Sequence, residues 1–443
     1  MTCCRREVLW LVAAALVVRL AVLALSYAAP GALALRDYGQ NRGACASLGQ
    51  LVTRRPQCAV LAEDEIGYDA LGRNIAARRG WLLEQGWVIA QPATPTAYGG
   101  FLYPAFVGAI YAATGGDALA LFLVQCLLGA LVVAGVAVAA FRLGDRRAAL
   151  AAGTLAAIHP GLALNSAWVM SEALVVPLLL GAYLLWARYL ERPSAARACA
   201  FGAAAAAACL TRSPALFALG AMVVLSLPRR GFAWRPHARH LAAALVLFAA
   251  CVAPWAARNA RTFHAFVPLD TKSGAGLWLN NHPSPNPWRE VWDARPDARP
   301  EPGPVPGLNE AQADRYFRGL AARYVVEQPL TFAGVSAFRL ALALVPVPRY
   351  WGRWPAARAA AAALYVALTW LALAGLWRVR RQAEGRALIG IAGAWLLMMA
   401  CTAVGLRHRL AAEWAFTIAA GLALAVLPVP GPRRASAPPT PPR

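Results

Sequence analysis

Long apolar runs alternate with short polar segments along most of this chain. A helix needs about 20 predominantly apolar residues to cross a bilayer, and ten runs approach or reach that length. The predicted spans are residues 8–28, 118–141, 148–168, 173–190, 198–211, 214–228, 241–257, 356–377, 387–406 and 411–428. The pattern therefore predicts an all-α polytopic membrane protein with about ten transmembrane helices, within a range of roughly nine to twelve.

Two stretches leave alternatives open. Residues 8–28 fit a retained first span better than a cleaved signal peptide, because the apolar run is long for a secretory signal. Residues 198–228 form either one span or two short spans that meet near Arg212. A single span would reverse every later segment and place the basic stretch RVRRQAEGR outside, so we prefer two short spans.

The basic residues indicate the orientation of the chain. They gather at the two termini and in alternate loops, at Arg5, Arg6, Arg142, Arg146, Arg147, Arg188, Arg192, Arg197, Arg229, Arg230, Arg235, Arg239, Arg378, Arg380, Arg381, Arg386, Arg433 and Arg434. The other short loops contain little beyond Arg212, Arg407 and Arg409. The positive-inside rule then predicts cytosolic termini and places loops 30–117 and 258–355 on the outer face of a bacterial plasma membrane.

We expect one transmembrane domain over residues 1–428 and a disordered cytosolic tail over residues 429–443. The first outer loop contains TAYGGFLYPAFVGAIYAATGG, whose apolar part of about fourteen residues is short for a span and predicts an interfacial or re-entrant helix. The second outer loop ends in a similar segment at residues 331–348. In the first loop, Cys45 and Cys58 are a candidate disulfide if the loop faces an oxidising compartment.

Composition narrows the functional classes. The chain is 59% hydrophobic, 14% charged and has a net charge of +22, and Lys272 is the only lysine among its 43 Lys and Arg residues. A basic chain often binds nucleic acid, but orientation explains arginines in short loops, so we expect no nucleic-acid partner. The sequence contains no Walker loop, dinucleotide-binding glycine pattern, serine nucleophile elbow or zinc-ligand spacing.

The polar residues predicted on the outer face suit sugar transfer from a lipid phosphate. The acidic ones are Glu63, Asp64 and Glu65, at the start of an amphipathic helix, and Glu172, in a turn between two spans. The others are Arg212, Arg258, Asn259, Arg407 and Arg409. A carboxylate can take the proton that an acceptor hydroxyl loses as it attacks the anomeric carbon. The planar fork of arginine pairs with phosphate oxygens.

The same residues also have structural interpretations. Carboxylates favour the first turn of any helix, so the acidic run alone is typical of a solvated helix start. Arginines near the ends of spans often extend to lipid headgroups. Glu172 is more specific, because an ionisable residue that borders two apolar spans is a functional candidate by default.

Seven strings follow one another over nearly the whole chain: DEIGYDALGRNIAARRGW, TAYGGFLYPAF, MSEAL, LTRSPAL, APWAARNARTF, DTKSGAGLWLNNHP and GLRHRLAAEWAF. In this order and spacing the chain resembles the bacterial membrane glycosyltransferases of the GT-C superfamily. It is most similar to the dolichyl-phosphate-mannose protein mannosyltransferase-like and aminoarabinose transferase-like branch. The resemblance implies a GT-C fold and inverting transfer of a hexosyl or pentosyl group from a polyprenyl-phosphate donor. The acceptor would be a glycan, lipid or protein on the outer face.

The resemblance also implies roles for individual residues. Asp64, Glu65 and Glu172 are the expected catalytic acids. The expected contacts of the donor phosphate or substrate are Tyr68, Tyr103, Arg212, Arg258, Asn259, Arg407 and Arg409. Some members use a divalent cation, here Mg²⁺ or Mn²⁺, and Asp64 and Glu172 would then be its ligands. The sequence leaves this cofactor open.

Two departures from the family pattern concern the donor site. The family often has a basic residue and a proline before the Tyr-Pro helix, where this chain has Gly99, Gly100 and Phe101. A phosphate contact is therefore expected to be missing or moved. The late arginine motif usually continues into a proline, where this chain has Ala411 and Ala412.

Three other functions stay open. A transporter or flippase of a lipid-linked glycan predicts charges buried in mid-membrane and internal repeats, and the sequence shows little of either. An O-antigen ligase or polymerase-like enzyme shares the large outer loop and arginines but lacks the early acidic motif. A non-catalytic scaffold would tolerate Asp64→Asn, which a transferase would not.

Overall fold

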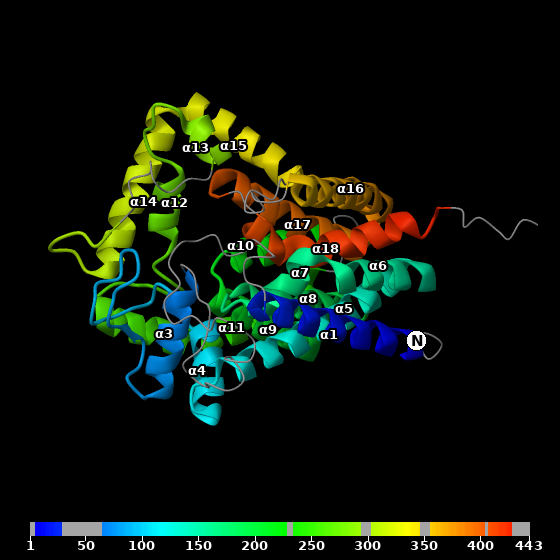
Figure 1. Cartoon of the computed structure of the whole chain (residues 1–443), viewed down its shortest axis with the longest axis horizontal. Helices are drawn as coiled ribbons and strands as arrows, with labels where there is room; N and C mark the ends of the chain where they lie inside the picture. The colour runs from blue at the N-terminus through cyan, green and yellow to red at the C-terminus, as the bar shows by residue number, and fades with distance from the viewer. Residues whose placement is uncertain are drawn as a thin grey trace, which may run out of the picture.

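The computed structural model describes residues 5–28, 64–227, 234–293, 303–345, 355–403 and 406–427. Helices make up most of this part of the chain, and the strands within it form a single short hairpin (Figure 1). The predicted all-α class is therefore confirmed. Cys45, Cys58, Glu63 and the tail 429–443 lie outside the described residues.

Within the described ranges, six helices are long and apolar enough to cross a membrane. They are α1 (Arg5–Ala28), α5 (Ala118–Leu143), α8 (Glu172–Glu191), α11 (Trp234–Phe263), α16 (Pro355–Val379) and α17 (Ala383–Cys401). The shorter apolar helices are α4 (Leu102–Thr114), α9 (Ala195–Thr211), α10 (Ala215–Ser226) and α15 (Pro329–Leu344). The tenth predicted span corresponds to α18 (Leu406–Leu424). Multiple apolar spans are confirmed, but the count of ten is not.

The third predicted span, residues 148–168, is not one continuous helix. It is replaced by α6 (Arg146–Ile158), α7 (Pro160–Leu164) and the 3₁₀ turn η2 (Asn165–Ala167). The chain bends by 55° at the break. Pro160 has no N–H for a continuing helix and disfavours helical backbone at the residue before it. His159 then caps α7, because its Nδ1 accepts a hydrogen bond from the Leu162 N–H at 3.2 Å. Counted as one bent span, the pair would be a seventh.

Residues 198–228 form two short helices and not one continuous helix, which agrees with the preferred alternative of two short spans. The first of them, α9, ends at Thr211, and α10 begins at Ala215. Arg212 lies in the break, where its backbone N–H still bonds to the Ala208 carbonyl at 2.9 Å. The break therefore places the arginine between the ends of two apolar helices.

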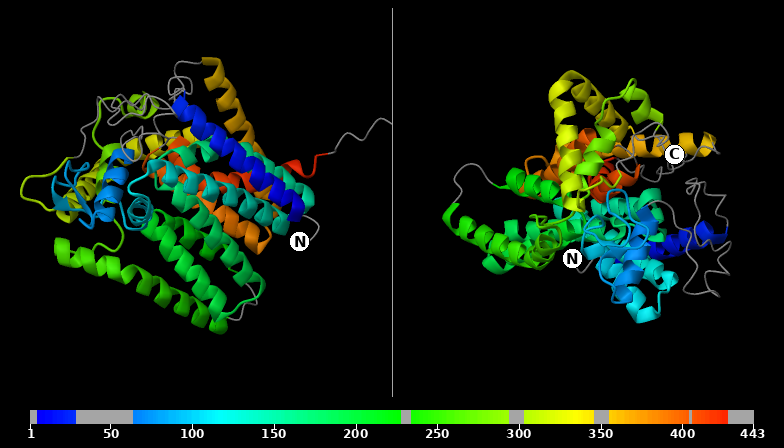
Figure 2. Two further views of the ribbon diagram at one scale, coloured as in Figure 1. Left: turned by 60° about the horizontal axis from the view of Figure 1, so that its bottom comes forward. Right: turned by 90° about the vertical axis from the view of Figure 1, so that its left-hand side faces the viewer.

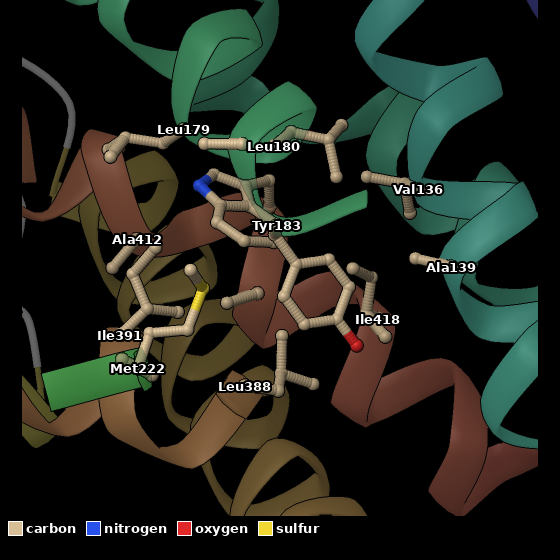
Figure 3. Packing of buried hydrophobic residues seen from close by; sticks show 14 of the residues in the cluster. Val136, Ala139, Leu179, Leu180, Tyr183, Met222, Leu388, Ile391, Ala412 and Ile418 are labelled. Atoms are coloured by element: carbon tan, nitrogen blue, oxygen red, sulfur yellow. The ribbon is translucent and has the colours of Figure 1, made fainter. Parts of the chain in front are cut away.

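The core of the bundle is built around α8 (Figure 3). Tyr183 is fully buried there beside Leu179 and Leu180 of the same helix. Side chains from α5, α10, α17 and α18 surround them: Val136, Ala139, Met222, Leu388, Ile391, Ala412 and Ile418. Because lipid tails are as apolar as these side chains, close van der Waals packing is what stabilises such contacts in a membrane.

Two glycines let α18 approach its neighbours backbone to backbone. A Cβ at Gly375 of α16 would lie 1.8 Å from the carbonyl oxygen of Ala419. A Cβ at Gly421 would lie 2.5 Å from the backbone nitrogen of Ala152 in α6. Small residues at helix interfaces permit this close packing, so α18 is fixed on two sides.

The remaining elements gather mainly at one end of the bundle. They are α3 (Asp64–Ala76), β1 (Leu82–Leu83), β2 (Thr94–Pro95), α12 (Ser273–Asn280), α13 (Pro287–Asp293) and α14 (Glu310–Glu327). In Figure 1, α3, α12 and α14 lie opposite the end at which α1 begins and α18 ends. Figure 2 shows α11 at one edge of the bundle, where it packs against α9. Since α11 continues to Phe263, Arg258 and Asn259 lie in its last turns and not in an irregular loop.

Candidate active site

Asp64 and Glu65 begin α3, and their side chains point to different partners. The unpaired N–H groups of a helix start favour carboxylates there, and neighbouring residues on a helix face directions about 100° apart. Asp64 contacts Arg407 and Lys272. Glu65 is buried and its Oε1 accepts a hydrogen bond from the Val169 N–H at 2.8 Å. Glu65 therefore links α3 to the turn before α8 through this hydrogen bond.

Arg407 contacts two of the predicted acidic residues, Asp64 and Glu172. Its Nη2 lies 2.6 Å from Asp64 Oδ2, and its Nε lies 3.3 Å from Glu172 Oε1. Glu172 is the first residue of α8 and Arg407 lies in the first turn of α18, so the starts of three helices meet at one guanidinium. The Glu172 side chain is 1% exposed, whereas those of Asp64 and Arg407 are 20% and 22% exposed. The cluster is thus open to solvent on the Asp64 side.

Arg212 completes the surroundings of Glu172. It follows directly after α9, and its Nη1 pairs with Glu172 Oε1. Ser171, also buried, lies 3.4 Å from the other oxygen of Glu172 through its hydroxyl. Two arginines therefore share one oxygen of a buried carboxylate. Both guanidinium groups lie at the ends of apolar helices.

Three residues that the sequence did not single out also surround Asp64. Lys272 Nζ lies 3.4 Å from Asp64 Oδ2 and within 5.2 Å of the ring centres of Trp87 and Tyr98. Trp87 Nε1 donates to Asp64 Oδ1 at 3.3 Å. Both rings come from the first outer loop and Lys272 from the second. The sequence does contain a signal for Lys272, because it is the only lysine in an arginine-rich chain.

Tyr68 and Tyr103, the two tyrosines predicted to contact substrate, belong to an aromatic cluster near Asp64. Tyr68, one turn after Asp64 on α3, packs edge-on against Tyr103 and Trp87, with ring centres 5.0 and 4.9 Å apart. Tyr103 is fully buried and donates to Gln125 Oε1 at 2.9 Å. Tyr68 therefore lies beside the acidic cluster, while the hydroxyl of Tyr103 is directed into the bundle.

Arg258 and Asn259 support the first outer loop. Arg258 Nη1 donates to the Thr96 carbonyl at 3.1 Å, and its guanidinium stacks 5.0 Å from the Trp255 ring. Asn259 is fully buried and donates to the Val267 carbonyl at 2.9 Å. Within the described ranges, neither residue forms a hydrogen bond with Asp64 or Glu172. The structure therefore does not bring Arg258 and Asn259 together with Asp64 and Glu172, because at the end of α11 both side chains bond to the loops beside it.

Arg409 lies in a different environment from Arg407. Its Nε is 2.7 Å from Glu413 Oε1, one turn further along α18, and both side chains are almost fully buried. Nη1 donates to the Ala343 carbonyl at 2.7 Å. His159, at the break between α6 and α7, lies 3.4 Å from the other oxygen of Glu413. Arg409 is thus not part of the group formed by Asp64, Glu172, Arg212 and Arg407.

The charges around Asp64 and Arg407 shift the protonation of neighbouring groups. Burial opposes ionisation of Asp64, but Lys272 and Arg407 outweigh it and hold the pKa of this carboxyl well below its usual range. His408 experiences the opposite effect, because burial and then the charges of Arg407 and Arg212 lower its pKa to about 3. The cluster therefore contains an ionised Asp64 and a neutral His408 at physiological pH.

A divalent cation does not fit this set of donors. Asp64 and Glu172 are the expected ligands, but the Arg407 guanidinium lies between them at 2.6 and 3.3 Å. Across the described ranges, no three His, Cys, Asp or Glu side chains form a group that could hold a metal ion. Arg407 supplies at this point the positive charge that a metal would provide.

The departures from the family pattern have local structural reasons. Gly100 has a φ of 71°, which L-residues with a side chain rarely adopt. A Cβ at Gly99 would lie 3.0 Å or less from Leu71 and Trp87. A larger residue at either position would therefore disturb the loop that holds Trp87. At the late motif, α18 continues without a proline through Ala411 and Ala412, which are buried in the core.

Comparison with known proteins agrees with this architecture. A family model described as dolichyl-phosphate-mannose-protein mannosyltransferase matches residues 99–257. The apo oligosaccharyltransferase of Archaeoglobus fulgidus is similar in structure, with a TM-score of 0.50 and 13% identity. That match covers 94% of this chain and 50% of the archaeal one, so this chain spans about half the length of that enzyme. The predicted resemblance to the GT-C superfamily is confirmed.

Two further solved structures have lower TM-scores. The archaeal oligosaccharyltransferase AglB from Archaeoglobus fulgidus, in complex with an inhibitory peptide and a dolichol-phosphate, gives 0.49 at 15% identity, and the match covers 94% of this chain and 50% of that one. ArnT from Cupriavidus metallidurans bound to undecaprenyl phosphate gives 0.45 at 16% identity, with 92% and 77% covered. No curated protein matches the chain. The similarity to the apo archaeal structure, at a TM-score of 0.50 and 13% identity, concerns the fold alone, so the chemistry depends on the residues of this chain.

Proposed function

We propose that the protein is an inverting membrane glycosyltransferase that moves a hexosyl or pentosyl group from a polyprenyl-phosphate donor to an acceptor. The observation that supports this most directly is the bridge from Asp64 through Arg407 to Glu172, with Arg212 on the same carboxylate. It combines the partly exposed carboxylate of Asp64 with two guanidinium groups at the ends of apolar helices. Transfer from a lipid phosphate needs a base and cations in this arrangement.

Asp64 is the proposed general base. The acceptor hydroxyl oxygen bonds to the anomeric carbon while the bond from that carbon to the phosphate oxygen breaks. The hydroxyl proton passes to the Asp64 carboxylate, and the electrons of the broken bond leave with the phosphate. The donor phosphodiester has one negative charge and the released polyprenyl phosphate has two. Attack from the face opposite the leaving phosphate inverts the anomeric centre.

Arg212 and Arg407 are the proposed contacts of the donor phosphate. Each presents a planar guanidinium that can bind two oxygens of one phosphate. Glu172 is almost fully buried between them and keeps both in place. Asp64 accepts the proton on the open side. Glu172 and Tyr68 would therefore position the reacting groups, and Asp64 would react.

The proposed location is a bacterial plasma membrane, with both termini in the cytosol and the active site on the outer face. The positive-inside argument from the sequence supports this orientation. Figure 1 is consistent with it, because the start of α1 and the end of α18 lie at one end and α3 lies at the other. The acceptor would then be a glycan, lipid or protein outside the cytosol.

One observation favours the alternative of a lipid-linked glycan transporter. Such a protein is expected to bury charged residues between apolar helices, and Arg409, Glu413 and His159 are buried in this way. Arg409 and Glu413 pair with each other at 2.7 Å, which also suits a purely structural contact. Sugar transfer that depends on Asp64 decides between the two functions.

The test is transfer of label from radioactive polyprenyl-phosphate sugars in membranes, at matched expression. Wild type is compared with Asp64→Asn and Glu172→Gln, and with Glu84→Gln as the matched control. Glu84 is an exposed acidic residue of the same loop and pairs with the exposed Arg79. We expect loss of transfer in the first two variants and normal transfer in the control. Normal transfer by Asp64→Asn would refute the proposed base.

A further inference from the structure

Lys272 is a second cation on Asp64 with an environment unlike that of Arg407. The two cations share Asp64 Oδ2, Arg407 at 2.6 Å and Lys272 at 3.4 Å. Arg407 is also held by Glu172, whereas the Lys272 ammonium lies over the rings of Trp87 and Tyr98. The Lys272 side chain is 34% exposed and that of Arg407 is 22% exposed. Lys272 is therefore the more loosely held of the two.

The backbone at Lys272 is fixed, so only the side chain is free to change partners. The Lys272 N–H donates to Asp270 Oδ1 at 3.2 Å, and its carbonyl accepts from the Gly276 N–H at 3.0 Å in the first turn of α12. The four-carbon stem of lysine has many rotamers and a compact charge. A change of partner would therefore require neither loop motion nor any shift of α12.

Asp64 cannot act well as a base while both cations remain on it. Two positive charges at one carboxylate oxygen stabilise its ionised form and hold its pKa well below the usual range. A carboxylate of such low basicity is a poor acceptor for the proton of a hydroxyl. At the same time the departing phosphate gains a second negative charge and needs another cation nearby. One movement would meet both requirements.

We propose that Lys272 moves from Asp64 to the donor phosphate during transfer and stays on the released polyprenyl phosphate. This inference rests on the proposed glycosyltransferase function. As the bond between the anomeric carbon and the phosphate oxygen breaks, Lys272 pairs with the additional negative charge on the phosphate. Asp64 then keeps Arg407 alone and takes the acceptor proton. No proton leaves Lys272 in this step. It is a catalytic residue through its charge.

Trp87 and Tyr98 would guide this movement. Both rings lie beside the ammonium, with centres 5.2 and 5.1 Å away, and the faces of aromatic rings attract cations. Trp87 also donates to the other oxygen of Asp64 at 3.3 Å. The carboxylate therefore keeps its orientation when the lysine leaves. The ammonium in turn keeps an attractive surface between its two partners.

The first experiment compares wild type with Lys272→Gln, Lys272→Arg and the control Arg79→Gln. Arg79 is an exposed cation of the first outer loop, 2.6 Å from Glu84. In Lys272→Gln we expect kcat to fall by roughly 100-fold, as on loss of one preorganised charge. We expect inhibition by free undecaprenyl phosphate, the dianion, to weaken by ~10-fold, and the donor KM to change less, because the donor has one negative charge. Lys272→Arg restores part of both losses, and Arg79→Gln behaves as wild type.

The pH profile separates this role from a merely structural one. Without Lys272, Asp64 has one cation fewer, so the acid limb of kcat/KM moves to higher pH in Lys272→Gln. Thermal unfolding of each variant shows that the fold is intact. A Lys272→Gln enzyme with the wild-type pH profile and wild-type inhibition by undecaprenyl phosphate would overturn the proposal. So would an equal loss of affinity for donor and product.

The single lysine permits a second, direct test. Acetylation with an amine-selective reagent, followed by mass spectrometry of the peptide that contains Lys272, measures access to this ammonium. We expect undecaprenyl phosphate to protect Lys272 and the uncharged alcohol undecaprenol to leave it reactive. Equal reactivity with both lipids would overturn the proposal.

Failure of the two proposals can be told apart. Protection of Lys272 by undecaprenyl phosphate without any sugar transfer would refute the transferase function and leave the phosphate contact standing. Transfer that is lost in Asp64→Asn and unchanged in Lys272→Gln would refute the role of Lys272 and leave the transferase standing.

Discussion

Arg407 and Arg409 lie two residues apart on α18 and have opposite surroundings. Arg407 is 22% exposed and bridges Asp64 and Glu172, which come from other helices. Arg409 is fully buried, pairs with Glu413 on its own helix and lies with its guanidinium 4.4 Å from the Phe416 ring. Two residues along a helix turn the side chain by about 200°. The arginine motif is thus two separate sites, one toward solvent and one in the bundle.

The difference shows what burial does to a charge. A half-open ion pair can exchange partners with an incoming anion, because water and the ligand compensate for the lost contact. A buried pair cannot, because either partner left alone in an apolar interior is strongly destabilising. We therefore expect changes at Arg407 to affect transfer and changes at Arg409 to affect folding.

The largest expected effect on transfer is at Arg407. Arg407→Gln removes the cation between Asp64 and Glu172, and we expect the transfer rate to fall by ~10²–10³-fold. The melting temperature in detergent should stay close to that of wild type, because the site is partly solvated. Loss of folded protein in this variant, with normal specific activity of what remains, would contradict the comparison.

The corresponding change at Arg409 should act on stability. Arg409→Leu leaves Glu413 buried without its partner, at a cost of about 3–5 kcal/mol in the free energy of unfolding. The double variant Arg409→Leu/Glu413→Leu should recover most of this, because apolar side chains suit the site. Thermal unfolding measures both. Normal stability with lost transfer in Arg409→Leu would instead place Arg409 in the active site.

Glu65 provides a smaller version of the same contrast beside Asp64. Glu65→Ala leaves the buried Val169 N–H without its acceptor, which costs about 1–3 kcal/mol of stability. Glu65→Gln keeps an acceptor oxygen and should be milder in both stability and transfer. Rates per folded molecule should fall far less than in Asp64→Asn. A rate as low as that of Asp64→Asn would make Glu65 a second reacting acid.

His408 lies between the two arginines and should respond to pH through stability. Its pKa is lowered from 6.5 to about 3, so the unfolded chain binds a proton in this range that the folded chain does not. The stability that the neutral His408 side chain contributes is fully present above pH 6.5 and is lost as the pH falls toward 3. Between pH 7.5 and pH 5, the free energy of unfolding of wild type should fall by about 2 kcal/mol through His408. The His408→Gln variant should not show this loss, so its stability relative to wild type should rise by the same amount. Equal melting temperature differences at both pH values would contradict this.

The smallest expected effect is that of metal removal. Because Arg407 lies where a divalent cation would bridge Asp64 and Glu172, transfer should continue after treatment with EDTA. Activity measured before and after dialysis against EDTA, and again with added Mg²⁺ or Mn²⁺, tests this. Loss of transfer that either ion restores would show that Arg407 gives way to a metal.

Much of the site follows from the sequence, because orientation alone brings residues to one face. Asp64, Glu172, Arg212 and Arg407 were expected together from alternate loops, and they share direct contacts. Arg409 was grouped with them because the sequence does not show that α18 begins before residue 407. Without that boundary, the directions in which Arg407 and Arg409 point from the helix cannot be told apart. Lys272 was missed because its partners lie more than 150 residues away in the chain.

The fold was predictable at the level of class and less so in its helices. Apolar length identified most helices, since a bilayer sets that length. The bend at His159 and Pro160 replaced a continuous third span, although proline in an apolar run is a visible signal. Arg258 and Asn259 were placed in a loop because α11 runs past the end of its apolar stretch, and polar residues do not mark such an extension.

The close contact of Gly375 with Ala419 fixes α18 against α16 at a point far from Arg407. Ala419 and Arg407 are twelve positions apart on one helix, or about 18 Å. A single methyl group at position 375 would push the Ala419 backbone away and tilt the far end of α18, because no side-chain rotation can relieve a clash with a carbonyl oxygen. The position of Arg407 in the proposed site thus depends on the absence of a side chain at residue 375.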